Sequence, residues 1–235
     1  MTKIYCAIDT PDLKLATNLA YQVSGAGCGI KLGLEFFATN GPDGVAAILK
    51  ACPDSKIFLD MKYHDIPNTV AGALRGAARL GVAYINCHAS GGMEMMKIGL
   101  DALLDESLKL GVPPPRFLAV TVLTSIDQQA LISVGQTGTP PEQVIKLAKL
   151  TRDSGLAGIV CSGQEIRLVR ESLGDDFVLM VPGIRPVGTD SGDQKRIMSP
   201  QDAILAGATH LVIGRPITGA NDPAQAASDI LETLK

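Results

Sequence analysis

The segment KIFLDMKYHDIPNTVAGALRGAARLGVAYINCH, residues 56–88, contains the pattern of a strand, a helix and a second strand. Short apolar and β-branched runs at 56–61 and 83–87 predict the two strands. Residues 69–80 between them have a helical pattern that ends at Gly81. Glycine directly after a helix supplies the terminating left-handed residue at little cost. The segment therefore predicts one β-α-β unit of a parallel sheet.

The same alternation continues on both sides of this segment. Eight β-α units with short links and no break in composition favour one α/β domain over residues 1–235, a single (β/α)8 TIM barrel. A doubly wound sheet is the alternative, and it usually has fewer strands. The predicted strands are residues 4–8, 29–32, 56–61, 83–87, 117–123, 158–161, 177–181 and 210–213, and the predicted helices are residues 12–23, 42–51, 69–80, 93–110, 141–154, 165–173, 200–206 and 223–234.

Composition excludes several classes of protein. The chain has 235 residues, of which 46% are hydrophobic, and a net charge of -3, so it lacks the basic surplus that a nucleic-acid partner requires. No apolar run is long enough to span a bilayer, and residues 1–12 lack the pattern of a secretory signal. The five cysteines have no CxxC spacing, which disfavours a zinc site or a disulfide scaffold. We therefore expect a cytoplasmic protein with reduced thiols, no membrane and no nucleic acid.

Polar side chains follow nearly every predicted strand. The C-terminal ends of barrel strands carry the chemistry in this architecture. Charged groups that close apolar strands lose solvation, so they need partners or ligands there. The candidates are Asp9, Lys31, Asp60, Lys62, His88, Thr124, Ser125, Arg185 and Arg215.

The densest group is Asp60, Lys62 and Asp65. Side chains alternate along a strand, so Asp60 and Lys62 are expected on one face. Two carboxylates beside an ammonium favour its charged form, which suits a proton donor and not a nucleophile. A structural ion-pair network is the alternative. Asp9 and Lys31 end two neighbouring strands. A purely structural ion-pair network would therefore have to account for charged residues at the ends of three adjacent strands.

Glycine and arginine follow the seventh and eighth strands, at Gly183 to Arg185 and at Gly214-Arg215. Barrels commonly bind phosphate with the loops after these strands. Glycine lets backbone N–H groups approach the anion, and arginine can bind it through two parallel hydrogen bonds. We expect the polar loop at residues 185–196 to fold over the phosphate. Two solvated surface arginines are the alternative.

Other polar residues carry weaker signals. His88 either lines the site or is a hydrogen-bonded structural histidine, whereas His210 begins its strand at the opposite end and is interpreted as structural. His64 is given no role, because the strand is expected to end before it. Thr124 and Ser125 either bond a ligand ring or cap a turn.

Together these residues resemble the orotidine 5'-monophosphate decarboxylase family in its bacterial-type short form. The resemblance covers essentially the whole chain. DxKxxD alone is shared with related phosphate-binding barrels, whereas the DIPNT extension and the GDQKR loop are highly specific. The matching stretches are DMKYHDIPNT at 60–69, TVLTS at 121–125, PGIRP at 182–186, GDQKR at 192–196 and VIGRPI at 212–217.

The resemblance implies a catalytic array of Lys62, Asp60, Asp65 and Lys31. Lys62 would protonate C6 of the pyrimidine, Asp60 would lie beside the departing carboxylate, and Asp65 would complete the array. The substrate-binding residues would be Asp9 and Lys31 at the ribose hydroxyls, Thr124 and Ser125 at the pyrimidine edge, and Arg185, Gln194, Gly214 and Arg215 at the 5'-phosphate.

The resemblance also implies a homodimer with shared active sites, because Asp65, Ile66 and Thr69 would reach into the neighbouring subunit's site. The reaction would convert orotidine 5'-monophosphate to UMP and CO₂ in pyrimidine synthesis, a carboxy-lyase activity. No cofactor and no metal are expected: the glycines at 25–29 precede a strand instead of following one, unlike a dinucleotide fingerprint. Fixed charges must then stabilise the developing carbanion.

Two other functions stay open at this point. A metal-dependent lyase of the same barrel superfamily would share the phosphate site and DxKxxD, and would act on a sugar phosphate with Mg²⁺. A phosphate-binding barrel without activity is the second alternative, and the intact Asp–Lys–Asp cluster argues against it.

Overall fold

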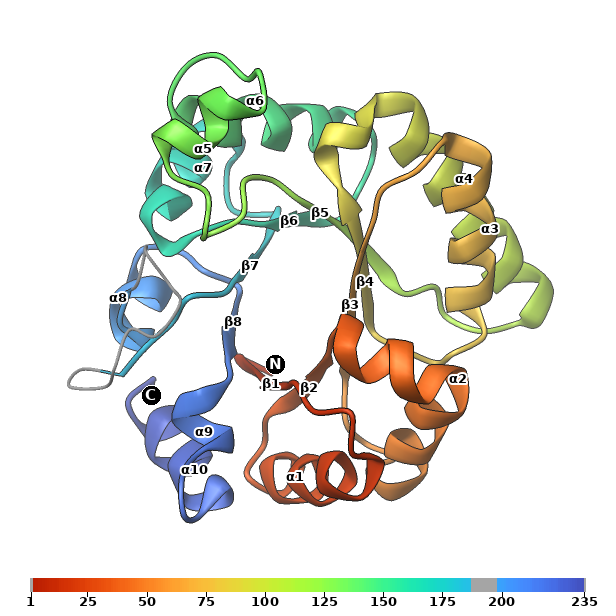
Figure 1. Cartoon of the computed structure of the whole chain (residues 1–235), viewed down its shortest axis with the longest axis vertical. Coiled ribbons are helices and arrows are strands. Elements are labelled where there is room, and N and C mark those ends of the chain that lie inside the picture. Colours follow the sequence, from red (N-terminus) through yellow and green to blue (C-terminus); the bar gives the residue numbers. More distant parts are fainter. Residues whose placement is uncertain (1, 187–197, 235) are drawn as a thin grey trace.

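The computed structural model of the chain describes residues 2–186 and 198–234. Eight parallel strands form a closed barrel in chain order, and the first strand pairs with the last. The helices form a ring outside the strands (Figure 1). The predicted (β/α)8 barrel is confirmed.

Each strand is short and is followed by at least one helical segment. The strands are β1 Ile4–Ile8, β2 Gly29–Leu32, β3 Ile57–Tyr63, β4 Tyr84–His88, β5 Arg116–Val120, β6 Gly158–Val160, β7 Val178–Val181 and β8 His210–Ile213. The helices are α1 Leu13–Gly25, α2 Leu34–Ala51, α3 Pro67–Ala78, α4 Gly92–Leu110, α5 Gln128–Ser133, α6 Pro140–Asp153, α7 Ile166–Leu173, α8 Pro200–Leu205, α9 Arg215–Thr218 and α10 Pro223–Glu232, with 3-10 turns η1 Ala89–Gly91 and η2 Gly163–Glu165.

Several predicted boundaries are wrong. β3 runs two residues past the expected end, because Tyr63 pairs with Cys87 after a shift in register. β5 stops at Val120, three residues early. Helix α2 begins eight residues earlier than expected and is kinked at Gly41. Short helices α5 and α9 were not predicted.

Alternation along the strands sorts their side chains into two cores. In β1, Tyr5 and Ala7 belong to the core inside the barrel, whereas Ile4, Cys6 and Ile8 pack in the larger core beneath the helices. Inward-facing side chains at the C-terminal end of each strand, called here the upper end of the barrel, therefore meet above the inner core.

The same alternation fixes the inward residues of the next two strands. Ile30 and Leu32 of β2 pack outward, so Lys31 between them faces the barrel interior. In β3, Phe58 joins the inner core, and Asp60 follows it on the same side. The register pairs Lys31 with Phe58, so charged and apolar inward positions lie close together across these strands.

Aromatic rings close the lower end of the barrel. The rings of Tyr5, Phe58, Tyr84 and His210 pack edge-on against one another. His210 donates from Nδ1 to the Thr2 carbonyl and forms a second bond with the Tyr84 hydroxyl, both 2.8 Å long. Burial lowers the pKa of His210, which favours this neutral form. These contacts agree with the structural role predicted for this histidine.

The five cysteines are buried free thiols, as expected for small core residues. Across residues 2–186 and 198–234, no helix has both the length and the apolar character needed to cross a membrane.

Candidate active site

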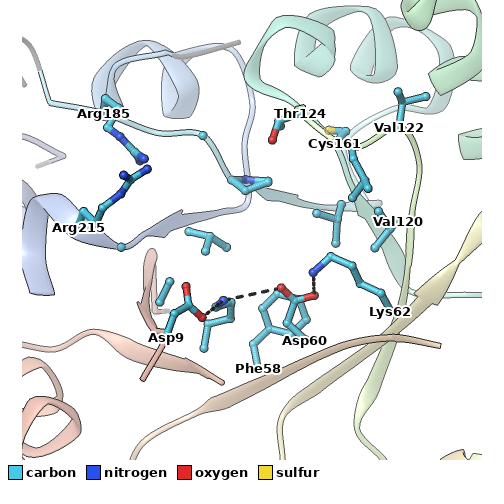
Figure 2. Close-up of a pocket in the computed structure, with 18 of the residues that line it drawn as sticks. Asp9, Phe58, Asp60, Lys62, Val120, Val122, Thr124, Cys161, Arg185 and Arg215 are labelled. Atoms are coloured by element: carbon cyan, nitrogen blue, oxygen red, sulfur yellow. Dashed lines mark hydrogen bonds and ion pairs between the residues drawn. The ribbon is translucent and has the colours of Figure 1, made fainter. Parts of the chain in front are cut away.

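A cavity of about 550 Å³ opens at the C-terminal ends of the strands. Its lining comes from β1–β3, from β5–β8 and from the turns that follow them. Charged side chains lie on two sides of the cavity, and Val120 and Val122 lie on the side away from the arginines (Figure 2). The cavity therefore offers a ligand two groups of charged contacts and an apolar wall.

A chain of alternating charges runs along one side, from β1 to β3 (Figure 2). The buried Lys31 ammonium lies 2.7 Å from Oδ1 of Asp9 and 3.9 Å from Oδ2 of Asp60. The Lys62 ammonium lies 2.7 Å from Oδ1 of Asp60. Each carboxylate oxygen of Asp60 thus faces a different lysine.

The Asp60 carboxylate is kept ionised by this arrangement. Burial alone would raise its pKa, because a charged carboxylate loses solvation there. The charges of Lys62 and Lys31, with hydrogen bonds from Lys62 and Asn86, outweigh burial and hold the pKa of Asp60 below its ordinary value. A fixed negative charge therefore lies at the centre of the array.

The backbone of β3 is irregular at Lys62, whose side chain lines the cavity. The pairing of β3 with β4 changes register between Leu59 and Tyr63, and Lys62 has a φ of 50°. It is the one non-glycine residue of the described ranges with a positive φ. Such a conformation costs about 1–3 kcal/mol and is concentrated at functional sites.

Arg185 and Arg215 lie on the opposite side, where their guanidinium groups point toward one another (Figure 2). Arg185 is buried two residues after Gly183, which has a φ of 76° that favours glycine. The Arg185 N–H donates to the Met198 carbonyl (3.0 Å), which joins the two flanks of residues 187–197. Two guanidinium groups on one wall suit an anion with several oxygens.

The structure brings together eight of the predicted site residues. The cavity is lined by Asp9, Lys31, Asp60, Lys62, Thr124, Arg185, Gly214 and Arg215. Gln194 lies outside the described residues, as does most of the predicted loop at 185–196.

Four predicted residues lie elsewhere in the single chain. Ser125 is exposed, because β5 ends five residues before it, and it does not line the cavity. Asp65, Ile66 and Thr69 are exposed at the start of α3. The Asp65 carboxylate accepts the Ile66 backbone N–H (2.6 Å). Of the two expected carboxylates, the structure pairs only Asp60 with Lys62 within one chain.

Sequence reasoning missed Asn86. This residue is fully buried in β4, accepts a hydrogen bond from the Lys62 backbone N–H, and donates one to Asp60 (both 2.7 Å). The available signal was a single amide side chain among the apolar residues of the strand predicted at 83–87.

His88 lies at the end of the same strand, outside the cavity lining. Its ring is 5.6 Å from that of His64. Burial, with the nearby His64 and Lys62, lowers the pKa of His88 in spite of the opposing charge of Asp60. Among the described residues, no group of three or more histidine, cysteine, aspartate or glutamate side chains is arranged to hold a metal ion.

Comparison with known proteins gives consistent matches over the full length. Residues 2–230 match the profile described as the orotidine 5'-phosphate decarboxylase / HUMPS family. The chain is 52% identical to an orotidine 5'-phosphate decarboxylase of Rhodospirillum rubrum, covering 95% of this chain and 90% of the relative. It is 50% identical to that of Paramagnetospirillum magneticum, covering 98% and 97%.

A solved structure agrees with these matches. The crystal structure of orotidine 5'-phosphate decarboxylase from Lactobacillus acidophilus aligns over 100% of both chains. The TM-score is 0.87 and the sequence identity is 34%.

Proposed function

This chain belongs to the orotidine 5'-phosphate decarboxylase / HUMPS family, and from that premise we propose that it converts orotidine 5'-phosphate to UMP and CO₂. The observation that carries the proposal is the cavity itself. An Asp–Lys array on one side faces a pair of arginines on the other, at the C-terminal end of the barrel. This arrangement matches a ligand with a reacting acid group at one end and a phosphate at the other.

The proposed binding mode follows the lining of the cavity. Arg185 and Arg215, with the backbone at Gly214, hold the 5'-phosphate, and Asp9 and Lys31 hold the ribose hydroxyls. Thr124 directs its hydroxyl toward the cavity, where it can bond the pyrimidine edge (Figure 2). The valine side chains of β5 and β6 supply an apolar wall for the ring. Gln194 is proposed as a further phosphate ligand.

The proposed chemistry depends on Lys62. When the bond from C6 to the carboxylate breaks, CO₂ leaves and the electron pair stays on C6. The Lys62 ammonium stabilises this charge and then donates its proton to C6, after which the neutral lysine takes a proton from water. Asp60, held ionised, repels the substrate carboxylate in the ground state. No electron sink is needed, because the fixed ammonium stabilises the negative charge on C6.

We also propose that the enzyme is a homodimer with shared sites. Asp65, Ile66 and Thr69 are exposed at the start of α3 instead of lining their own chain's cavity. Ile66 is 67% exposed, which is unfavourable for an isolated apolar side chain beside a charged residue. Insertion into a partner's cavity would bury it and bring Asp65 to the partner's Lys62.

The competing function is a metal-dependent lyase, since the family name also includes HUMPS proteins. The relatives that are about half identical to this chain carry the decarboxylase name, which favours decarboxylation.

The test is direct. Purified protein is mixed with orotidine 5'-phosphate, and the fall in absorbance as UMP forms is followed with and without EDTA. We expect equal rates in both samples. Absence of turnover would refute the decarboxylase proposal, and a rate abolished by EDTA and restored by Mg²⁺ would favour the lyase.

A further inference from the structure

A buried asparagine in β4 joins the two central residues of the charged array. Asn86 has no exposed surface and does not line the cavity. Its side-chain oxygen accepts the Lys62 backbone N–H, and its side-chain nitrogen donates to Oδ1 of Asp60. Both bonds are 2.7 Å long. One amide therefore contacts both residues without access to a ligand.

The bond to the Lys62 N–H lies where the strand pairing is irregular. β3 changes register against β4 between Leu59 and Tyr63, and Lys62 has a φ of 50°. An unpaired buried N–H would add to the cost of this conformation. Asn86 supplies the missing acceptor, so it stabilises the backbone that sets the direction of the lysine side chain.

The bond to Asp60 fixes the carboxylate plane. Oδ1 accepts from both Asn86 and Lys62, while Oδ2 is directed at Lys31, 3.9 Å away. Rotation of the carboxylate would break the bond to the buried amide. Asn86 thus holds one oxygen toward each lysine.

We propose that Asn86 is a positioning residue for decarboxylation, which holds the Lys62 ammonium and the Asp60 carboxylate in their reactive arrangement. The inference rests on the proposed function. Asparagine suits this position because its amide offers one acceptor and one donor in a single plane. Aspartate would keep the acceptor, lose the donor and place a second carboxylate against Asp60. Alanine would lose both bonds.

The test compares Asn86→Ala and Asn86→Asp with the wild type. For Asn86→Ala, kcat should fall at least ~10-fold, because small displacements of reacting groups have large effects on rate. The affinity for UMP should change less than about 3-fold, because the arginines that hold the phosphate lie on the other side of the cavity. Thr151→Val is the matched control: it removes a fully buried side-chain hydrogen bond within α6, and its kcat should stay at the wild-type value.

The pH profile separates positioning from a general packing role. Asp60 faces Lys31 of β2 and Lys62 of its own strand, and His88 of β4 lies close enough to sense its charge. A carboxylate at position 86 would raise the pKa of Asp60, since a like charge disfavours ionisation. The acid limb of kcat for Asn86→Asp should therefore move to higher pH by at least about 1 unit.

Wild-type kcat in Asn86→Ala, or an unshifted acid limb in Asn86→Asp, would overturn the proposal. So would equal losses of kcat and UMP affinity. If Asn86→Ala does not fold, the nearly isosteric Asn86→Asp decides the question alone.

A direct measurement keeps this inference separate from the function. Hydrogen exchange of the Lys62 backbone amide should be at least ~10-fold faster in Asn86→Ala than in the wild type. This holds even if the wild type fails to decarboxylate orotidine 5'-phosphate, which would refute only the proposed function. Unchanged exchange would refute the hydrogen-bonding role of Asn86.

Discussion

The Lys62 ammonium donates a hydrogen bond of 2.7 Å to Oδ1 of Asp60, two residues earlier in β3. Both side chains reach the cavity, although the backbone between them departs from regular strand geometry. The pair places a fixed positive charge and a fixed negative charge at one wall of the cavity. Such an arrangement lowers the reorganisation that the reaction requires.

The first prediction concerns the proton donor. Lys62→Ala should lower the rate of decarboxylation by at least about 10³-fold, because it removes both the stabilising charge and the transferred proton. Binding of UMP, measured by calorimetry, should persist, since the phosphate contacts are intact. Lys56→Ala is the control, because Lys56 precedes the same strand at the opposite end of the barrel. Turnover near the wild-type rate in Lys62→Ala would refute its role.

The second prediction concerns the phosphate. Arg215→Ala removes one of two guanidinium groups that face the cavity (Figure 2). A hydrogen bond to a charged group contributes roughly 1.5–3 kcal/mol, so the KM and the Kd for UMP should rise about 10- to 100-fold. Titration with UMP and steady-state kinetics measure both constants.

Arg152→Ala is the matched control for Arg215→Ala, because Arg152 lies on the exposed part of α6 and should leave both constants unchanged. If Arg215→Ala retains wild-type affinity and rate, the phosphate does not bind where we place it.

The strand pattern accounts for much of this site. Period-two alternation and the glycines that end helices are local signals, and they were sufficient to predict the barrel and to place Lys31 and Asp60 at its upper end. The residues after the seventh and eighth strands were placed by a different rule, the usual position of phosphate sites in such barrels.

Other features depend on contacts between distant segments, which alternation cannot predict. At the register shift, the Lys62 backbone N–H donates to Asn86, which lies in the neighbouring strand. The end of β5 also lies at a contact with a segment distant in sequence. The Thr121 hydroxyl and backbone N–H both donate to the Val160 carbonyl of the neighbouring strand, and Ser125 is exposed four residues later.

The third prediction concerns stability against pH. The pKa of Asp60 lies below its ordinary value of 3.8 in the folded protein, since its lysine partners and hydrogen bonds outweigh burial. The unfolded state therefore binds more protons at this group, and the folded state gains stability as pH rises through this range. The contribution is complete above the ordinary value and is lost as pH falls through the lower, folded value.

Asp60→Asn should lower the free energy of unfolding by about 1–3 kcal/mol near pH 7, because two ammonium groups lose their shared partner. The difference from the wild type should shrink below about pH 4, where the wild-type carboxylate begins to protonate. Urea unfolding between pH 3 and 7 measures this. Asp175→Asn, at a side chain that is 97% exposed, provides the control. A difference that stays constant down to pH 3 would contradict the expectation.

The fourth prediction tests shared sites. If the proposed homodimer forms, each site combines Lys62 of one subunit with Asp65 of the other. A mixture of inactive Lys62→Ala and Asp65→Ala subunits would then form mixed dimers with one intact site. Random exchange should restore about a quarter of the wild-type activity, because half of the dimers are mixed and each has one site in two.

The control is a mixture of Lys62→Ala with Asp60→Asn. Both residues line the cavity of their own chain and contact each other there, so neither site of a mixed dimer is free of substitutions. Each site in such a mixture carries one defect, and activity should stay at the level of the separate variants. Recovery with Asp65→Ala but not with Asp60→Asn would assign Asp65 to the partner's site. No recovery in confirmed mixed dimers would contradict the proposal that the two subunits share their sites.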